Sequence, residues 1–135
     1  MSRATSISLS AKQVMIVSIT GAVLWFGAAL LMRKVVKLDV YEGLGVAVVY
    51  ALTIPGTIPF VILLRKLASL RGDQLAIGYT VATAAALLLD GLAFAFCPSL
   101  YADNPADGLQ AAAAILWGAG VGLVLSIVMN RTALE

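Results

Sequence analysis

The sequence has no histidine, a single cysteine and few charged residues, and each scarcity narrows what the protein can be. Without histidine or a second cysteine, we expect no zinc, haem or iron–sulfur site, and Cys97 has no partner for a disulfide within the chain. Serine and threonine hydroxyls have no histidine or lysine placed to activate them, so an enzyme is not predicted. We therefore expect no catalytic residue, no metal and no cofactor.

The chain is poor in charged residues and rich in hydrophobic ones. Charged residues make up 12% of the chain and hydrophobic residues 61%, and the mean hydropathy is +1.01. A soluble domain of average composition is about 25% charged and about 45–50% apolar. The net charge of +2 forms no concentrated basic stripe, so nucleic acid is not an expected partner. The composition instead predicts a lipid bilayer as the solvent.

Four apolar runs are long enough to cross a bilayer. A hydrocarbon core of about 30 Å needs about 20 residues of helix, and lipid offers no partner for unpaired backbone groups. Helices of a soluble bundle would alternate apolar and charged faces, which these runs do not. The first run is also longer than a signal peptide and ends in two basic residues. We predict an all-α, integral membrane four-helix bundle with short loops, as one domain over residues 1–135 with spans at 14–32, 44–64, 75–96 and 109–129.

Lysine and arginine fall unevenly on the two sides that four spans define. With an even number of spans, both termini share a side with the connection between the second and third spans. This side has more basic residues, and because cytoplasmic loops are enriched in them we predict N-in and C-in. The terminal side carries Arg3, Lys12, Arg65, Lys66, Arg71 and Arg131, and the opposite side carries Arg33, Lys34 and Lys37.

Small residues spaced four apart predict which helix faces meet. Helices associate in lipid where small residues let backbones approach, and residues four apart share a face. Three spans carry such a row, and we expect the rows to meet inside the bundle. They are Gly43, Ala47, Ala51, Pro55 and Pro59 in the second span, Gly78, Ala82, Ala86 and Asp90 in the third, and Ala114, Gly118, Gly122 and Ser126 in the fourth.

The middle of the second span contains Pro55-Gly56 and Pro59. Each proline removes a backbone donor and clashes with the preceding turn, so we expect a kink or local unwinding. The hydroxyls of Thr53 and Thr57 are expected to bond the carbonyls that the prolines free. Both a hinge beside a substrate path and a static kink fit this pattern.

Asp90 is the one acid inside a hydrophobic span. It lies six residues before the end of the third span, roughly 9–10 Å inside the outer boundary. A charged aspartate near a helix centre costs about 2.5–3.5 kcal/mol, so Asp90 should face the bundle and meet a donor, or be protonated. Depth counting along the other spans places Trp25, Tyr50 and Trp117 at the same level. We predict a polar layer of Asp90 with Trp117, Tyr50 or Trp25, although both tryptophans also fit the role of interfacial anchors.

The last two spans carry a longer motif, Leu-Leu-Asp90-Gly91-Leu-Ala-Phe-Ala-Phe-Cys-Pro98-Ser-Leu-Tyr101, followed by Leu-Trp117-Gly118-Ala-Gly-Val-Gly122. This stretch, residues 85–125, resembles a bacterial family of small four-span inner-membrane proteins of unknown function. The resemblance implies an inner-membrane location and signature positions at Asp90-Gly91, Pro98, Tyr101 and Trp117-Gly118, but no activity. Small multidrug transporters carry their functional acid in the first span, which has none here, so a close match to them is excluded.

Two functional hypotheses follow from the intramembrane acid. The first is a small transporter or channel-like protein with Asp90 at its polar site, and a homodimer is kept open as its assembly. The second is a non-transporting accessory or structural protein in which Asp90 only fixes helix packing. A solvent path to Asp90 favours the first hypothesis. A sealed Asp90 bonded to Trp117 or Tyr50 favours the second.

Overall fold

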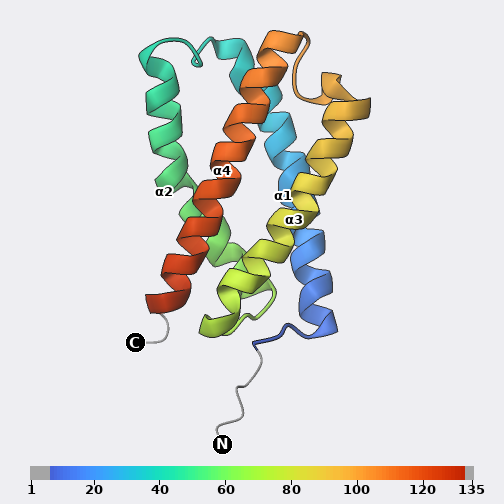
Figure 1. Cartoon of the computed structure of the whole chain (residues 1–135), viewed down its shortest axis with the longest axis vertical. Helices are drawn as coiled ribbons and strands as arrows, with labels where there is room; N and C mark the ends of the chain where they lie inside the picture. Colours follow the sequence, from blue (N-terminus) through green and yellow to red (C-terminus); the bar gives the residue numbers. More distant parts are fainter. Residues whose placement is uncertain (1–6, 133–135) are drawn as a thin grey trace, which may run out of the picture.

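A computed structural model describes residues 7–132 of the chain, with side chains up to residue 130. Within this range four long helices, α1 (Ala11–Val35), α2 (Leu44–Leu67), α3 (Leu75–Phe96) and α4 (Pro105–Thr132), pack as an up-and-down bundle (Figure 1). The predicted all-α four-helix bundle is confirmed, and each predicted span lies within one helix. Single 3₁₀ turns in the connections occupy Val36–Leu38, Gly72–Gln74 and Pro98–Leu100.

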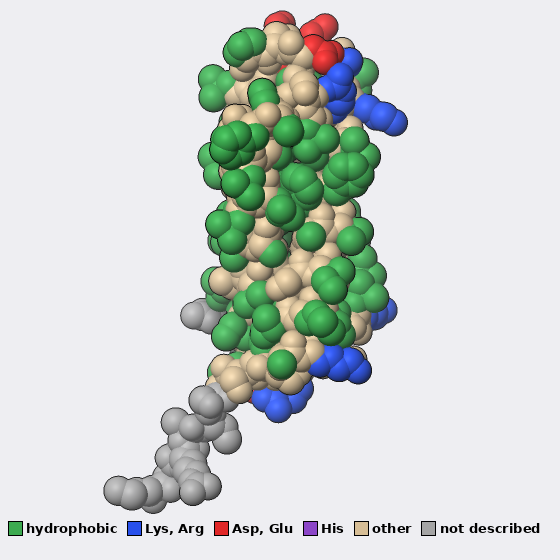
Figure 2. All heavy atoms as spheres, turned by 90° about the vertical axis from the view of Figure 1, so that its right-hand side faces the viewer, with side chains coloured by type: hydrophobic (Ala, Val, Ile, Leu, Met, Phe, Trp, Pro, Cys, Tyr) green, Lys and Arg blue, Asp and Glu red, His purple; other side chains and the backbone are tan. Residues whose placement is uncertain are grey.

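All four helices are long and apolar enough to cross a membrane. Only 6–22% of the residues in their apolar windows are buried inside the bundle. Leu88 and Phe96, for example, are 72% and 78% exposed. Figure 2 shows a hydrophobic belt between charged side chains at the two ends. An apolar surface of this extent suits lipid rather than water, as expected of a multi-pass membrane protein.

Figure 1 places the start of α1 and the end of α4 at one end of the bundle, here called the lower end. The α2–α3 connection shares this end, and the α1–α2 and α3–α4 connections form the upper end. Arg3 and the Arg131 side chain lie outside the described residues. The remaining basic residues of the lower end are Lys12, Arg65, Lys66 and Arg71, and the upper end combines Arg33, Lys34 and Lys37 with Asp39, Glu42, Asp103 and Asp107.

The lower end is closed by polar side chains that hold the start of α1 against the α2–α3 connection. Ser10 and Gln13 form a capping box: the Ser10 hydroxyl accepts the Gln13 N–H at 3.2 Å, and the Gln13 side chain accepts the Ser10 N–H at 2.9 Å. The Gln13 amide also donates to the Gln74 side chain at 3.1 Å, and Gln74 donates to the Ser8 carbonyl at 2.9 Å. These bonds fix the entry of the chain into the first span.

The helices pair unequally. α1 packs along α3 and α2 along α4, α3 also meets α4, and α1 has little contact with α2. Glycines allow the close approaches: a Cβ at Gly21 would overlap the Ala82 carbonyl on α3, and one at Gly122 would overlap the Tyr79 ring. A Cβ at Gly78 would come within 2.5 Å of the Leu70 side chain.

The prediction that three small-residue rows meet inside the bundle is right for two of them. The rows of α3 and α4 face inward, whereas α2 buries Thr57, Val61 and Leu64 instead of its small residues. A proline bends a helix away from its own side, and helices curve with their convex side outward, so the proline row belongs on the outside. The exposed residues of the α2 row are Gly43, Ala47, Ala51, Pro55 and Pro59.

Of the two predicted alternatives, a kink or local unwinding, α2 shows the bend and not the unwinding, because it remains α-helical through both prolines. Figure 1 shows the helix turning toward the bundle axis in its lower half. The Thr53 hydroxyl donates to the Val49 carbonyl at 2.9 Å, and the Thr57 hydroxyl donates to the Thr53 carbonyl at 2.7 Å. The prolines free the carbonyls of residues 51 and 55. A threonine in a helix reaches only three or four positions back, so the prediction that these hydroxyls bond the freed carbonyls is wrong.

Two apolar cores close the bundle at its ends. The lower core contains residues of α1, α2 and α3, among them Val17, Val61 and Leu75. The upper core surrounds Tyr101. The full upper core consists of Ala29, Val36, Tyr41, Ala93, Tyr101, Ala102 and Ala111. Between the two cores the helices line a partly open cavity, and the candidate site lies at its upper part.

Candidate intramembrane site at Asp90

The cavity has a volume of about 730 Å³ and is lined by all four helices. Its wall is mostly apolar, as in most small-molecule sites, which typically measure about 300–1,000 Å³. All lining residues except Tyr41 lie within the four membrane-length helices, so most of the cavity is at the level of the hydrocarbon core. Its polar lining residues are Trp25, Tyr41, Thr53, Thr57, Tyr79, Thr83 and Asp90.

Asp90 is 8% exposed and is held by two donors from different parts of the chain. The Trp25 indole N–H of α1 donates to Oδ1 at 2.8 Å, and the Tyr101 hydroxyl donates to the same oxygen in a short bond. The Trp25 N–H is shared with the Tyr101 oxygen at 3.0 Å. Oδ2 accepts no hydrogen bond from the described residues, and Asp90 lines the cavity. The carboxyl group is thus fixed on one side and available on the other.

Tyr101 reaches Asp90 from outside the spans. Pro98 cannot continue α3, so the chain turns through Pro98–Leu100, and Tyr101 then enters the upper core. The Tyr101 ring is fully buried and stacks on Phe94 of α3, with centroids 3.9 Å apart and planes 9° apart. Burial, and then the bond to Asp90, raise the pKa of the Tyr101 hydroxyl above its usual value, so it remains a donor at physiological pH.

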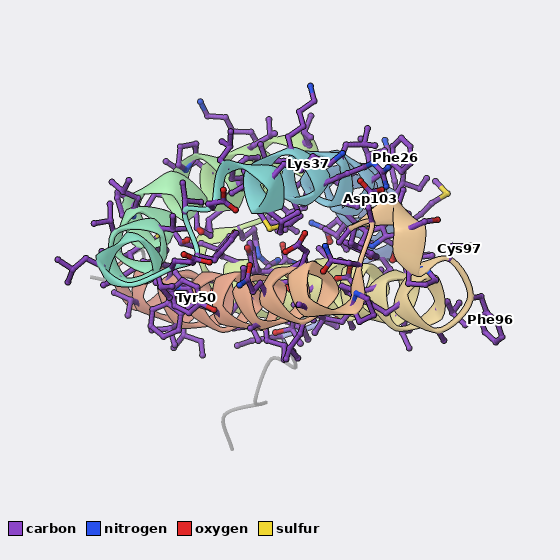
Figure 3. The ribbon with its side chains drawn as sticks, turned by 90° about the horizontal axis from the view of Figure 1, so that it is seen from above. Phe26, Lys37, Tyr50, Phe96, Cys97 and Asp103 are labelled. Carbon is purple, nitrogen blue, oxygen red and sulfur yellow. The ribbon has the colours of Figure 1, made fainter. Side chains whose placement is uncertain are left out.

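An ion-pair cluster holds this connection in place. Arg33 approaches Asp103 at 2.7 Å and donates to the Ser99 carbonyl, and Lys37 approaches Asp103 at 2.9 Å (Figure 3). The hydrogen bond from Lys37, followed by the charge of Arg33, keeps the pKa of Asp103 below its usual range. We refer to Arg33, Lys37 and Asp103 as the upper latch. The latch ties the end of α1 to the segment that carries Tyr101.

The predicted polar layer forms with one of its three candidate partners. The structure brings Trp25 to Asp90, whereas Trp117 and Tyr50 form a separate pair between α4 and α2. Their rings stack at 5.3 Å, and the Trp117 indole donates to the Tyr50 carbonyl at 3.0 Å. Trp117 is 41% exposed, so it lies on the outer surface of the bundle rather than in the site beside Asp90. Figure 3 places Tyr50 across the bundle from Asp103.

The remaining predicted site residues take different places. Gly56 and Gly118 line the cavity, whereas Pro55 and Pro59 lie on the outer side of α2. The closely packed glycines Gly78 and Gly122 are buried but do not line the cavity. Within residues 7–132 no three acidic or cysteine side chains gather to hold a metal ion.

Estimating depth from residue number along each span does not find Tyr101, the second partner of Asp90. Tyr101 is nevertheless part of the sequence motif that begins just before Asp90. The usable signal is an aromatic residue in an otherwise small and polar connection, directly after a proline turn. No family model matches the chain, and no curated protein or solved structure matches it either.

Proposed function

We propose that the protein is a small membrane transporter that binds its substrate in the cavity, with Asp90 as the polar group of the site. The observation that carries this proposal is a cavity of about 730 Å³ at membrane depth, with an Asp90 carboxyl oxygen that accepts no hydrogen bond from the described residues. A buried carboxyl group in an apolar wall favours a ligand that can bond or neutralise it. A bundle that needed Asp90 only for packing would have no use for the adjoining space.

A carrier is favoured over a channel. The cavity lies between the upper and lower apolar cores rather than running to either end of the bundle. Passage of a substrate from one side of the membrane to the other then requires movement of a helix. α2 is the best candidate because it has little contact with α1 and because Pro55 and Pro59 each lack a backbone hydrogen bond. In this proposal the segment Pro55-Gly56 to Pro59 is the hinge.

The second candidate function is the accessory or structural one, and a specific observation favours it. Asp90 Oδ1 receives bonds from Trp25 and Tyr101, so one carboxyl group joins α1, α3 and the α3–α4 connection. Such a junction would fix helix register without any ligand. The two functions differ in what they require of Asp90, since packing needs an acceptor oxygen and transport needs the carboxylate.

We further propose a bacterial inner membrane with the lower end in the cytoplasm. The lower end carries most of the basic residues in the sequence, and Asp103 neutralises part of the positive charge at the upper end. A homodimer is proposed as the assembly, with the exposed small-residue row of α2 as its most suitable face, since such rows favour close helix contact.

The test uses the full chain in proteoliposomes and three dansyl probes that share one alkyl chain and end in trimethylammonium, hydroxyl or sulfonate. Uptake of each probe is compared between the unchanged protein, Asp90→Asn and Asp107→Asn. The last is the matched control because Asp107 lies in the first turn of α4 and does not line the cavity. Asparagine keeps an acceptor for Trp25 and Tyr101, so the bundle should stay folded.

We expect at least one probe to enter faster than into protein-free vesicles. Asp90→Asn should slow that uptake at least tenfold, and Asp107→Asn should leave it unchanged. Uptake of no probe, or uptake that Asp90→Asn does not slow, contradicts the transport proposal. Undiminished uptake together with a loosened bundle supports the structural role instead.

A further inference from the structure

The wall of the cavity attracts positive charge. Among the described residues that line it, Asp90 is the one acid, and none is a lysine or arginine. The Thr53 and Thr57 hydroxyls donate their hydrogen atoms to backbone carbonyls, so their oxygens remain available as acceptors. Aromatic rings of Trp25 and Phe60 also line the space, and their faces attract cations. Acceptor oxygens, ring faces and one carboxylate together suit a cation and disfavour an anion.

The cavity has an opening toward the lipid. α1 and α2 have little contact along their length, and both contribute lining residues that are also exposed. On α1 these include Val23 and Leu31, which are 66% and 56% exposed, and on α2 Phe60, which is 47% exposed. Gly27 lies on the same face of α1 as Val23 and Leu31, four residues from each. Gly56 lies on the same face of α2 as Phe60, four residues away. We call this apolar opening the α1–α2 window.

The two glycines of the window face empty space. A Cβ built at Gly27 or Gly56 meets no atom within 4 Å, in contrast to Gly21 and Gly122, where a Cβ would overlap a neighbouring helix. Both glycines line the cavity. The window is therefore open where side chains are smallest, and it lies within the apolar parts of α1 and α2 rather than at either end.

We propose that the cavity takes an amphipathic cation that is dissolved in the bilayer and enters sideways through the α1–α2 window to pair with Asp90. This inference rests on the proposed function and adds the substrate class and the entry route. Because both ends are closed by apolar cores, lipid is the phase that reaches the opening. The apolar rim favours the tail of an amphiphile, and the carboxyl group favours its positive head.

Binding is measured in the Trp117→Phe variant, which retains Trp25 as its one tryptophan. Trp25 lines the cavity, so energy transfer from its indole to a dansyl group reports a probe bound there. The vesicles consist of phosphatidylglycerol, which has no ammonium headgroup. We expect saturable transfer to the trimethylammonium probe and at least tenfold weaker binding of the hydroxyl and sulfonate probes. Asp90→Asn should lower the affinity for the cation at least tenfold.

The entry route is tested by the rate at which the transfer signal appears. Gly56→Leu and Gly27→Leu narrow the window from either side, and Gly120→Leu is the matched control. Gly120 is exposed on α4, meets no atom within 4 Å of an added Cβ and does not line the cavity. Each change replaces a helical glycine by a better helix former, so folding should not suffer. We expect the two window variants to bind the cation at least tenfold more slowly and the control to bind at the normal rate.

Each outcome separates the inference from the proposed function. Equal binding of the neutral or anionic probe overturns the cation class, while Asp90-dependent uptake of that probe still supports transport. Normal binding rates in both window variants overturn the lateral route. A loss of affinity when phosphatidylethanolamine is added shows that a lipid headgroup is the occupant and overturns a free amphipathic cation. Unchanged affinity supports it.

Discussion

Replacing Tyr101 by phenylalanine tests whether the Asp90 junction holds the upper end together. The substitution removes a buried hydroxyl that donates to Asp90 and accepts from Trp25 at 3.0 Å. The ring remains stacked on Phe94, so apolar packing changes little. Hydrogen bonds to charged groups contribute about 1.5–3 kcal/mol in soluble proteins, whereas bonds between membrane helices average about 0.6 and reach about 1.7 kcal/mol. We expect the free energy of unfolding to fall by about 1–2 kcal/mol, because no water replaces the lost partner.

The matched control is Tyr41→Phe. Tyr41 belongs to the same upper core and is 7% exposed, but its hydroxyl donates only to the Met32 sulfur at 3.6 Å, a weak acceptor. Unfolding is followed by far-UV circular dichroism during detergent titration in mixed micelles. A loss that is equal for the two variants within about 0.5 kcal/mol would refute the reasoning. So would a full loss for Tyr101→Phe in an Asp90→Ala background, where the hydroxyl has no carboxyl group to bond.

Three further predictions concern packing, charge and orientation. Gly21→Ala should destabilise the bundle by about 1–3 kcal/mol, because the added methyl group would overlap the Ala82 carbonyl on α3. Gly27→Ala should stabilise it by up to about 1 kcal/mol, because alanine is the better helix former and meets no neighbour there. Equal effects of the two substitutions in a thermal unfolding assay would contradict the described α1–α3 contact. The hydrogen bond from Lys37 lowers the pKa of Asp103 on folding from its ordinary value of 3.8. Its ion pairs therefore stabilise the protein at pH values above 3.8, and this stabilisation is lost as the pH falls below 3.8. The difference in thermal midpoint between the unchanged protein and Asp103→Asn should therefore close under acid, and a constant difference would argue against the latch. Cys97, the one cysteine, is exposed at the upper end and should react with a membrane-impermeant maleimide added outside intact cells, whereas labelling only after lysis would reverse the proposed orientation.

The spans could be predicted from the sequence because they follow from local composition. About 20 apolar residues in succession need no knowledge of their neighbours to be recognised as a membrane helix. The inward direction of Asp90 follows from the same local rule, since a lipid-facing charge is unfavourable. The level of Trp25 beside Asp90 could also be predicted, because depth along a straight helix follows directly from residue number.

The errors arise where the fold depends on the relative placement of helices. Depth counting gives the height of Tyr50 and Trp117 but not their direction around the axis, and the pairing of α2 with α4 turns them toward each other. The small-residue row of α2 faces outward because its prolines set the direction of the bend. Counting residues along a span cannot find Tyr101, because Tyr101 lies in the α3–α4 connection and not in a helix of known depth.

The cavity itself leaves no trace in the sequence. It results from the weak contact between α1 and α2 and from the two cores that hold the ends together. Gly27 and Gly56 resemble the packing glycines in sequence, yet they face open space whereas Gly21 and Gly122 face another helix. Only the three-dimensional arrangement separates a glycine that brings helices together from one that leaves room for a ligand.

The most direct measurement of the central claim is the NMR signal of the Trp25 indole N–H in Trp117→Phe protein in lipid nanodiscs. We predict that this single indole resonance moves when the trimethylammonium probe is added, and that in Asp90→Asn it starts from a different position and no longer responds to the probe. A resonance that is unaffected by both the substitution and the probe would contradict a carboxyl group held by Trp25 at the wall of a ligand-binding cavity.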